Sequence, residues 1–108
     1  KHVLPLFLAL RDKDQEASTL NNIGAVYLAL GQNDHAIKYF KQALPLSRGL
    51  DNKVDVSATL NNMGVAYARL GDKQRALDHF KQALLVSRAV GDASGEASTL
   101  RSIAALNS

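Results

Sequence analysis

The sequence predicts an all-α protein built as a solenoid of stacked antiparallel helix hairpins. Three observations predict this fold: an internal repeat, apolar residues at helical spacing inside each copy, and glycine-containing breaks between the apolar segments. The run Thr-Leu-Asn-Asn-Ile-Gly at 19–24 returns as Thr-Leu-Asn-Asn-Met-Gly at 59–64, which is an offset of 40 residues. A fixed period of this length indicates stacked supersecondary units that bury their apolar faces against one another.

The same offset aligns many further positions, more than chance would align. A third copy begins at Thr99, and running the offset backwards places Pro5 on Pro45, so we expect the array to continue at both ends. The other matched positions are Tyr27 with Tyr67, Leu30-Gly31 with Leu70-Gly71, Ala36 with Ala76, and 40–44 with 80–84.

Each copy contains two predicted helices. Apolar residues of the first follow i, i+3, i+7, i+10 spacing, and those of the second follow i, i+3, i+7. Gly31 and Gly71 follow the last apolar residue of the first helix, where a left-handed φ would end it. The second helix runs on to a further break at 49–52 or 91–92. The helical positions are Leu20, Ile23, Tyr27 and Leu30, then Ile37, Phe40 and Leu44.

These breaks divide the chain into parts of a single array covering 1–108. Residues 1–11 are predicted to end a preceding second helix, 14–52 and 54–92 to form repeats 1 and 2, and 94–107 to form the first helix of repeat 3. Gly24 and Gly64 predict a close helix crossing, with the small Ala36 and Ala76 as the expected opposite partners. Pro45 predicts a second helix that is bent but continues.

The amino-acid composition argues against several classes of partner. Of the 108 residues, 46% are hydrophobic and 21% charged, the net charge is +3, and acidic and basic residues are interspersed. We therefore expect no nucleic-acid partner. The apolar stretch 3–10 is too short for a membrane span, so no membrane partner is expected. The absence of cysteine excludes disulfides and suits a cytoplasmic protein.

No pattern of residues predicts catalysis, a metal site or a cofactor. His35 and His79 lie at non-equivalent positions of the repeats, so we interpret them as surface residues. The acidic residues 12, 14 and 16 are interpreted as complementing the dipole at a helix start. The recurring pairs Ser47-Arg48 and Ser87-Arg88 have no neighbouring base, and we interpret them as helix surface. The chain is therefore predicted not to be an enzyme.

The repeat resembles the tetratricopeptide repeat family, which implies a right-handed superhelix. Two departures stand out: the period is longer than usual, and Arg48 and Arg88 stand where the family has proline. The long period is similar to that of the repeats in kinesin light chains and in bacterial arrays. The residues around Pro45 resemble the bacterial arrays most. The third copy departs further, at Ala104 and Asn107. The family pattern is carried by Leu20, Ile23, Gly24, Tyr27, Ala36, Phe40 and Ala43, and again by Leu60, Met63, Gly64, Tyr67, Ala76, Phe80 and Ala83.

The resemblance implies a protein–protein interaction scaffold whose first helices line a concave groove for a partner's peptide or helix. Paired asparagines there either bind a peptide backbone or brace neighbouring repeats, and both roles stay open. The lysine–arginine clamp that some relatives use for a C-terminal carboxylate is missing. The predicted groove residues are Ser18, Asn21, Asn22, Ala25, Leu28, Asn61, Asn62, Val65, Arg69 and Arg101.

Two other functions are weighed against this one. The apolar residues of 1–11 and the last helix could be completed by a second copy, which would make the chain a self-associating spacer. Alternatively, the array regulates another domain of a larger signalling protein. The apolar residues concerned are Leu4, Leu6, Phe7, Leu8 and Leu10.

Overall fold

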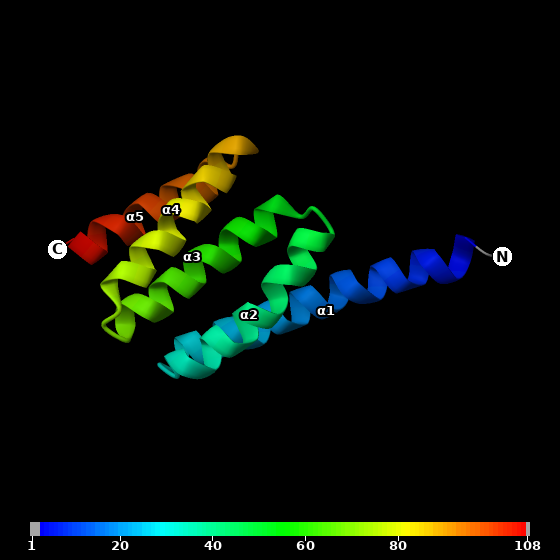
Figure 1. Ribbon diagram of the computed structural model, residues 1–108, viewed down its shortest axis with the longest axis horizontal. Helices are drawn as coiled ribbons and strands as arrows, with labels where there is room; N and C mark the ends of the chain where they lie inside the picture. Colours follow the sequence, from blue (N-terminus) through cyan, green and yellow to red (C-terminus); the bar gives the residue numbers. More distant parts are fainter. Residues whose placement is uncertain (1–2, 108) are drawn as a thin grey trace.

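The computed structural model describes the backbone of residues 3–107 and the side chains of residues 12–107. This part of the chain folds into five consecutive helices that zigzag along one axis (Figure 1), so the predicted all-α solenoid is confirmed. None of the described helices combines the length and apolarity needed to cross a membrane. The helices are α1 (Val3–Ala29), α2 (Asn33–Gly49), α3 (Lys53–Arg69), α4 (Lys73–Ala89) and α5 (Ala93–Asn107).

The four connections share one geometry. Each contains a residue with positive φ, and these are Gly31, Asp51, Gly71 and Gly91. The next amide bonds back to a carbonyl five residues earlier, as in the 2.9 Å bond from Asp72 N to the oxygen of residue 67. The predicted role of Gly31 and Gly71 is confirmed. The second connection, residues 50–52, lies within the break expected at 49–52: Gly49 is the last residue of α2, and Asp51 adopts the left-handed conformation.

In three of these connections the residue after the left-handed position also caps the following helix. Asn52 accepts a hydrogen bond from the amide of Asp55, and Asp72 and Asp92 accept from the amides three residues further on. A single residue therefore closes one helix and opens the next, which fixes the angle between them. Gln32, at the first connection, makes no such side-chain bond.

α1 differs from the expected boundary. It is continuous from Val3 to Ala29, across the region where residues 1–11 were expected to form the end of a separate helix. The aligned positions 51 and 91 are Asp and Gly, but this position is Arg11, and a non-glycine residue adopts positive φ only at a cost. The acidic residues 12, 14 and 16 therefore lie inside α1, so their interpretation as a helix start is wrong. The side chains of 3–11 lie outside the described residues.

Pro45 lies within α2, which continues to Gly49. The expected continuation of the helix past this proline is confirmed, and Figure 1 shows its ribbon unbroken. Proline has no amide hydrogen, so the carbonyl of Lys41 loses its helical partner. Pro45 is exposed, where water can satisfy that carbonyl.

The core is built on two equivalent contacts between a glycine and a phenylalanine. A methyl group placed on Gly24 would lie 2.6 Å from the nearest ring atom of Phe40, and one on Gly64 would collide with the ring of Phe80. The predicted close crossing therefore exists, but the rings are the nearest neighbours of the glycines, and not Ala36 or Ala76 as expected. Small residues leave space for the flat face of a large one, which is how interiors reach crystal-like packing.

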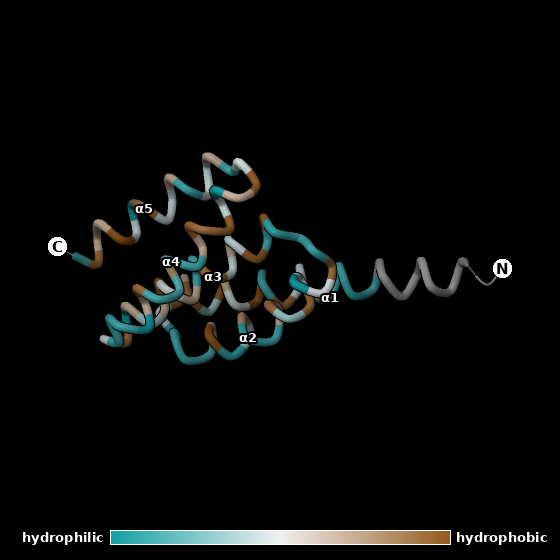
Figure 2. Tube along the Cα trace, turned by 45° about the horizontal axis from the view of Figure 1, so that its top comes forward, coloured by the Kyte–Doolittle hydropathy of each residue, from teal (hydrophilic) through white to brown (hydrophobic). Residues whose placement is uncertain are grey.

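The helices form two layers. Among the first helices of successive repeats, α3 contacts both α1 and α5, whereas among the described residues α2 and α4 do not contact each other. Figures 1 and 2 show the resulting stack in two views. Close inner helices and separated outer helices give the stack an inner face, lined by the first helices, and an outer gap between α2 and α4.

Candidate functional site: the inner face of the first helices

The inner face contains two hollows along the line where α3 runs beside α5. One, of about 340 Å³, lies near the start of both helices and is lined mainly by polar residues, among them Asn61, Asn62 and Ser98. The other, of about 500 Å³, lies near their ends and has Val65, Phe80 and Leu106 among its lining residues. The inner face therefore offers hydrogen-bonding groups at one end and apolar surface at the other.

Asn21 connects two repeats. Its Oδ1 atom accepts a 3.2 Å hydrogen bond from Oγ1 of Thr59, which is fully buried on α3. The two residues are 38 positions apart in the sequence, and this polar contact fixes the register of α1 against α3. The amide of Asn21 thus braces the array, which is one of the two roles that the sequence left open.

The equivalent pair at the next junction is Asn61 and Thr99. Both oxygens, Oδ1 of Asn61 and Oγ1 of Thr99, are buried, and neither has a hydrogen-bond partner among the described residues. Both residues line the polar hollow. A buried oxygen without a partner costs free energy, so this hollow favours a hydrogen-bond donor.

The second asparagine of each pair has a more open setting. Asn22 is exposed on α1, and Asn62 is half-buried on α3 beside the polar hollow. Ser18 and Ala25 are exposed on the same helix as Asn22. The two asparagines in a row therefore differ: one is directed into a junction between repeats and the other is accessible from outside.

At the other end of the face, Arg69 crosses from α3 to α1. Its Nη1 atom donates a 2.7 Å hydrogen bond to the carbonyl oxygen of Leu28, in the last turn of α1. A cation there complements the negative end of the helix dipole. Arg69 is exposed and also lines the apolar hollow with Val65, so its guanidinium combines a bracing contact with access to the hollow.

Arg101 lies apart from these groups. It is exposed on α5 at the position equivalent to Asn21 and Asn61. Ser102, one residue further on, lines the apolar hollow and donates a 3.1 Å hydrogen bond to the carbonyl of Ser98. The predicted groove residues all lie on the first helices, but only those of α3 line the hollows: Asn61 and Asn62 the polar one, and Val65 and Arg69 the apolar one.

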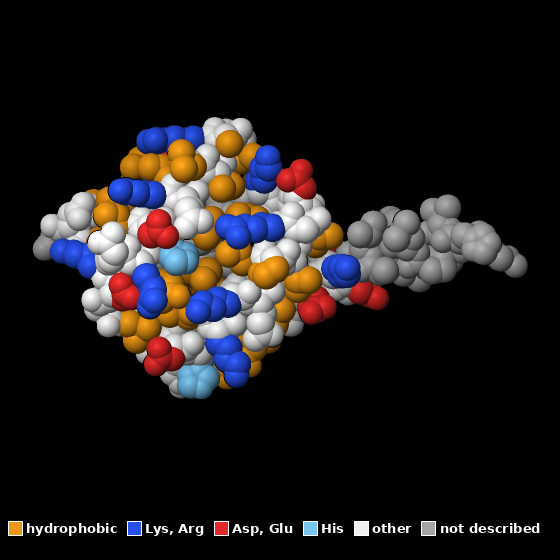
Figure 3. All heavy atoms as spheres, viewed as in Figure 1, with side chains coloured by type: hydrophobic (Ala, Val, Ile, Leu, Met, Phe, Trp, Pro, Cys, Tyr) orange, Lys and Arg blue, Asp and Glu red, His pale blue; other side chains and the backbone are white. Residues whose placement is uncertain are grey.

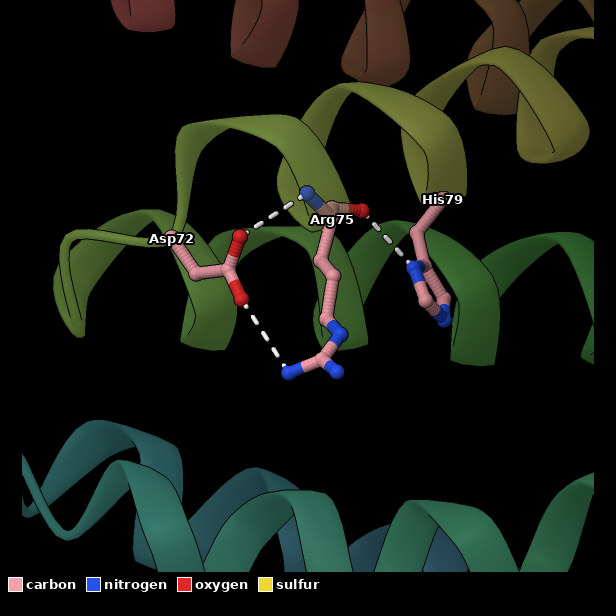
Figure 4. Close-up of polar contacts among 3 residues, drawn as sticks. All are labelled: Asp72, Arg75 and His79. Carbon is pink, nitrogen blue, oxygen red and sulfur yellow. Dashed lines mark hydrogen bonds and ion pairs between the residues drawn. The ribbon is translucent and has the colours of Figure 1, made fainter.

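The histidines belong to a different surface. Nδ1 of His79 donates a 2.8 Å hydrogen bond to the carbonyl oxygen of Arg75, which in turn contacts Asp72 through its backbone amide and its guanidinium (Figure 4). The ring of His79 lies 5.0 Å from that of Tyr67, and His35 stacks on the equivalent tyrosine of repeat 1. Among residues 12–107, no three His, Asp or Glu side chains form a group that could hold a metal ion.

The recurring serines are buried and not surface residues, so that interpretation is wrong. Ser47 is 3% exposed and Ser87 is fully buried. The hydroxyls of Ser57 and Ser87 bond to each other across α3 and α4, and that of Ser57 also donates to the carbonyl of Ala83. Only the packing of α3 on α4 brings the two serines together, since they are 30 residues apart in the sequence.

Charge is mixed on the outer surface. The face that carries the two described histidines has Lys and Arg side chains interspersed with Asp and Glu, and apolar side chains between them (Figure 3). Such a surface has no single-sign block of the kind that attracts a phosphate backbone.

Comparison with known proteins supports the fold. A model of the tetratricopeptide repeat matches the chain at residues 1–49, 15–89 and 55–108, which together cover the whole sequence. No curated protein matches the chain significantly. The crystal structure of the tetratricopeptide repeat domain of Arabidopsis FLU has a TM-score of 0.73 and 20% sequence identity, over 88% of this chain and 86% of that one. At this identity the likeness concerns the fold alone.

Proposed function

Because the chain belongs to the tetratricopeptide repeat family, we propose that it is an interaction scaffold whose inner face holds an extended or helical segment of a partner protein. The family's fold generally mediates protein–protein interaction and is typically not enzymatic. The partner segment would lie across α1, α3 and α5, whose side-by-side arrangement gives one continuous face.

The different settings of the paired asparagines carry this proposal. Asn21 already accepts a bond from Thr59, but Asn22 is exposed and Asn62 borders the polar hollow. Asparagine is a mediocre helix former, so one that is exposed or half-buried at the same position of two repeats suggests a role outside helix formation. Its amide can donate to one peptide group and accept from another, which suits an extended backbone.

The rest of the face supplies apolar and cationic groups. Leu28 and Val65 are half-buried, and each offers aliphatic surface. Arg69 and Arg101 are exposed, and either guanidinium can bind a carboxylate of the partner. We therefore expect a segment that combines hydrogen-bonding backbone, apolar side chains and at least one acidic group.

Selection of a random peptide display library against the intact chain tests the proposal. We expect the selected peptides to bind with micromolar to millimolar Kd, and the double variant Asn22→Ala/Asn62→Ala to bind them about tenfold or more weakly, since each lost hydrogen bond costs about 1 kcal/mol. Circular dichroism establishes that the variant keeps its fold.

A matched control comes from the second helices. Gln42 and Gln82 are also equivalent amides, on α2 and α4, away from the inner face. The variant Gln42→Ala/Gln82→Ala should bind the selected peptides like the unchanged chain. Undiminished binding by the folded asparagine variant would contradict the groove.

Self-association is a second candidate, favoured by the surface of α5. Leu100 is 44% exposed on this helix, and Ile103 and Leu106 are half-buried. A second copy that covers this surface would make the chain a structural spacer. Light scattering should then show a mass that rises with concentration for the unchanged chain and stays monomeric for Leu100→Ser; a monomer at all concentrations contradicts this candidate.

Finer features of the protein are also inferred. We infer a long-period array of the kind found in bacteria and in kinesin light chains, because α2 and α4 begin at residues 33 and 73, a period of 40. We place it in the cytoplasm, since it has no cysteine to form disulfides. Binding on the proposed face needs no cofactor, because its contacts are hydrogen bonds, apolar contacts and ion pairs.

A further inference from the structure

A hollow of about 320 Å³ lies in the outer gap, on the opposite side of the stack from the inner face. Its lining comes from the end of α2, the start of α3 and the end of α4. We call it the outer hollow; its lining residues are Arg48, Asp51, Lys53, Val56, Leu85, Val86 and Ala89.

The repeat itself shows which group fits beside Arg48. Its equivalent in repeat 2, Arg88, donates from Nε to Oε2 of Glu96 at 2.9 Å. Glu96 lies eight residues after its arginine, and the residue eight after Arg48 is Val56. The first junction thus has the arginine of this ion pair and lacks the carboxylate.

Charges around the outer hollow do not compensate for the missing carboxylate. Arg48 and Lys53 are both exposed, and within residues 12–107 neither forms an ion pair. Asp51 is the only acidic residue that lines the hollow, and its carboxylate lies beyond 4 Å of both cations. The rim therefore keeps a net positive charge toward solvent.

Apolar surface adjoins these cations. Leu85 is 68% exposed, although it is a large aliphatic side chain. Val56, on α3, is 5% exposed and packs with Leu60 and Ala83, while Val86 packs against this group from α4. An exposed leucine beside a hollow that is apolar inside and cationic at its rim is a surface that favours an amphipathic ligand.

We propose that the outer hollow is a second binding site, for a partner-protein segment that carries a carboxylate next to aliphatic side chains. The carboxylate takes the place that Glu96 has at the second junction and pairs with Arg48, and the aliphatic side chains cover Leu85 and Val86. Because this site opens between α2 and α4 and shares no lining residue with the two hollows of the inner face, the array can hold two partners at once.

Nuclear magnetic resonance titration of the intact chain with two capped peptides tests the site. One peptide is acetyl-Glu-Leu-Leu-amide, and the other has Gln in place of Glu, so they differ by one charge. We expect both to shift the amide signals of residues 53, 56, 85 and 86. The Glu peptide should bind about two- to fivefold more tightly, which is the strength of an exposed ion pair, and added salt should reduce this preference.

Two pairs of variants separate the parts of the site. Arg48→Met should remove the preference for the Glu peptide, whereas Arg88→Met, outside the hollow, should keep it. Leu85→Ser should weaken the binding of both peptides equally. Leu30→Ser, which changes a leucine that is 66% exposed and lies outside the hollow, should leave the binding of both unchanged. All four positions are exposed, so the fold should be retained.

Several results would overturn the proposal. Equal binding of the two peptides would show that the site does not recognise a carboxylate. Signal shifts confined to α5 or to the inner face would show that the outer hollow is not the binding site. Absence of shifts at millimolar peptide would do the same. A concentration-dependent dimer that Leu85→Ser abolishes would instead assign the outer hollow to a second copy of the chain.

Discussion

Repeats 1 and 2 share the run Thr-Leu-Asn-Asn, yet the two copies have different surroundings. Thr59 is fully buried and Leu60 is 1% exposed, whereas Thr19 is exposed and Leu20 is half-buried. The first helix of repeat 2 lies between α1 and α5, while the described part of α1 contacts neighbours on one side only. Identical residues therefore become core or surface according to which helices stack on them.

The two junctions between repeats also differ in their polar contacts. The first has the Thr59–Asn21 hydrogen bond, and the second has the Arg88–Glu96 ion pair. Each lacks what the other has: Thr99 has no hydrogen-bond partner among the described residues, and Arg48 has no ion pair there. Each contact has an unpaired equivalent in the same molecule, which provides its control.

The largest effect is expected at the two buried phenylalanines. Phe40 is fully buried and Phe80 is 1% exposed, so replacing either by alanine should lower the free energy of unfolding by about 3–5 kcal/mol. Urea denaturation followed by circular dichroism measures the change, with Leu30→Ala as the exposed control. A difference of more than about 2 kcal/mol between the two variants would show that the repeats do not share one kind of core.

Gly64→Ala should have the next largest effect. Alanine favours a helix by about 1 kcal/mol over glycine, but its methyl group would collide with the buried ring of Phe80. Overpacking costs about 1–3 kcal/mol, so we expect a net loss of about 1–2 kcal/mol in unfolding free energy.

The matched control for this change is Gly49→Ala. Gly49 ends α2 with nothing within 4 Å of an added methyl group, so here alanine should stabilise the protein by about 0.5 kcal/mol. If Gly64→Ala also stabilises the protein, the glycine–phenylalanine contact is looser than the structure indicates.

Threonine-to-valine changes compare the two junctions directly. Thr59→Val removes the hydrogen bond to Asn21 and should cost about 1 kcal/mol. Thr99→Val removes a buried hydroxyl without a partner and should be neutral or slightly stabilising. Thermal unfolding of the two variants side by side gives the comparison. Equal losses would mean that Thr99 and Asn61 bond to each other in solution.

The smallest effect is expected for the ion pair. Arg88 and Glu96 have side chains 54% and 34% exposed, so Arg88→Met should cost about 0.2–1 kcal/mol at low salt and less at high salt. Arg48→Met should leave the unfolding free energy unchanged at both low and high salt. Denaturation at two salt concentrations measures this, and a loss for Arg48→Met would reveal a carboxylate partner in the folded chain.

Much of the fold follows from the sequence, because the relevant signals are local. The 40-residue period, the helical spacing of apolar residues and the glycines of the first turns predict the two helices of each repeat and their order. The predicted helix end at Arg11 was wrong because a continuous helix is locally as favourable as a break there. Within the predicted break at 49–52 the sequence did not single out Asp51 as the residue with positive φ, because aspartate adopts positive φ only where the surrounding turn requires it.

The site is less predictable than the fold. The sequence identifies the asparagine pairs but not the role of each member, since both have the same chemistry and their difference lies in the neighbouring helix. Arg69 was expected to be available to a ligand, and its bond to Leu28 became visible only in the packed stack. The same holds for the partner of each glycine, which is a ring and not an alanine.

The sequence by itself determined the repeat, the helices and the residues at equivalent positions, because these depend on spacing along the chain. Tertiary structure alone decided which copy of a residue is buried, which arginine finds a carboxylate and where the hollows lie. These depend on contacts between residues tens of positions apart. Each such contact forms only once the helices stack.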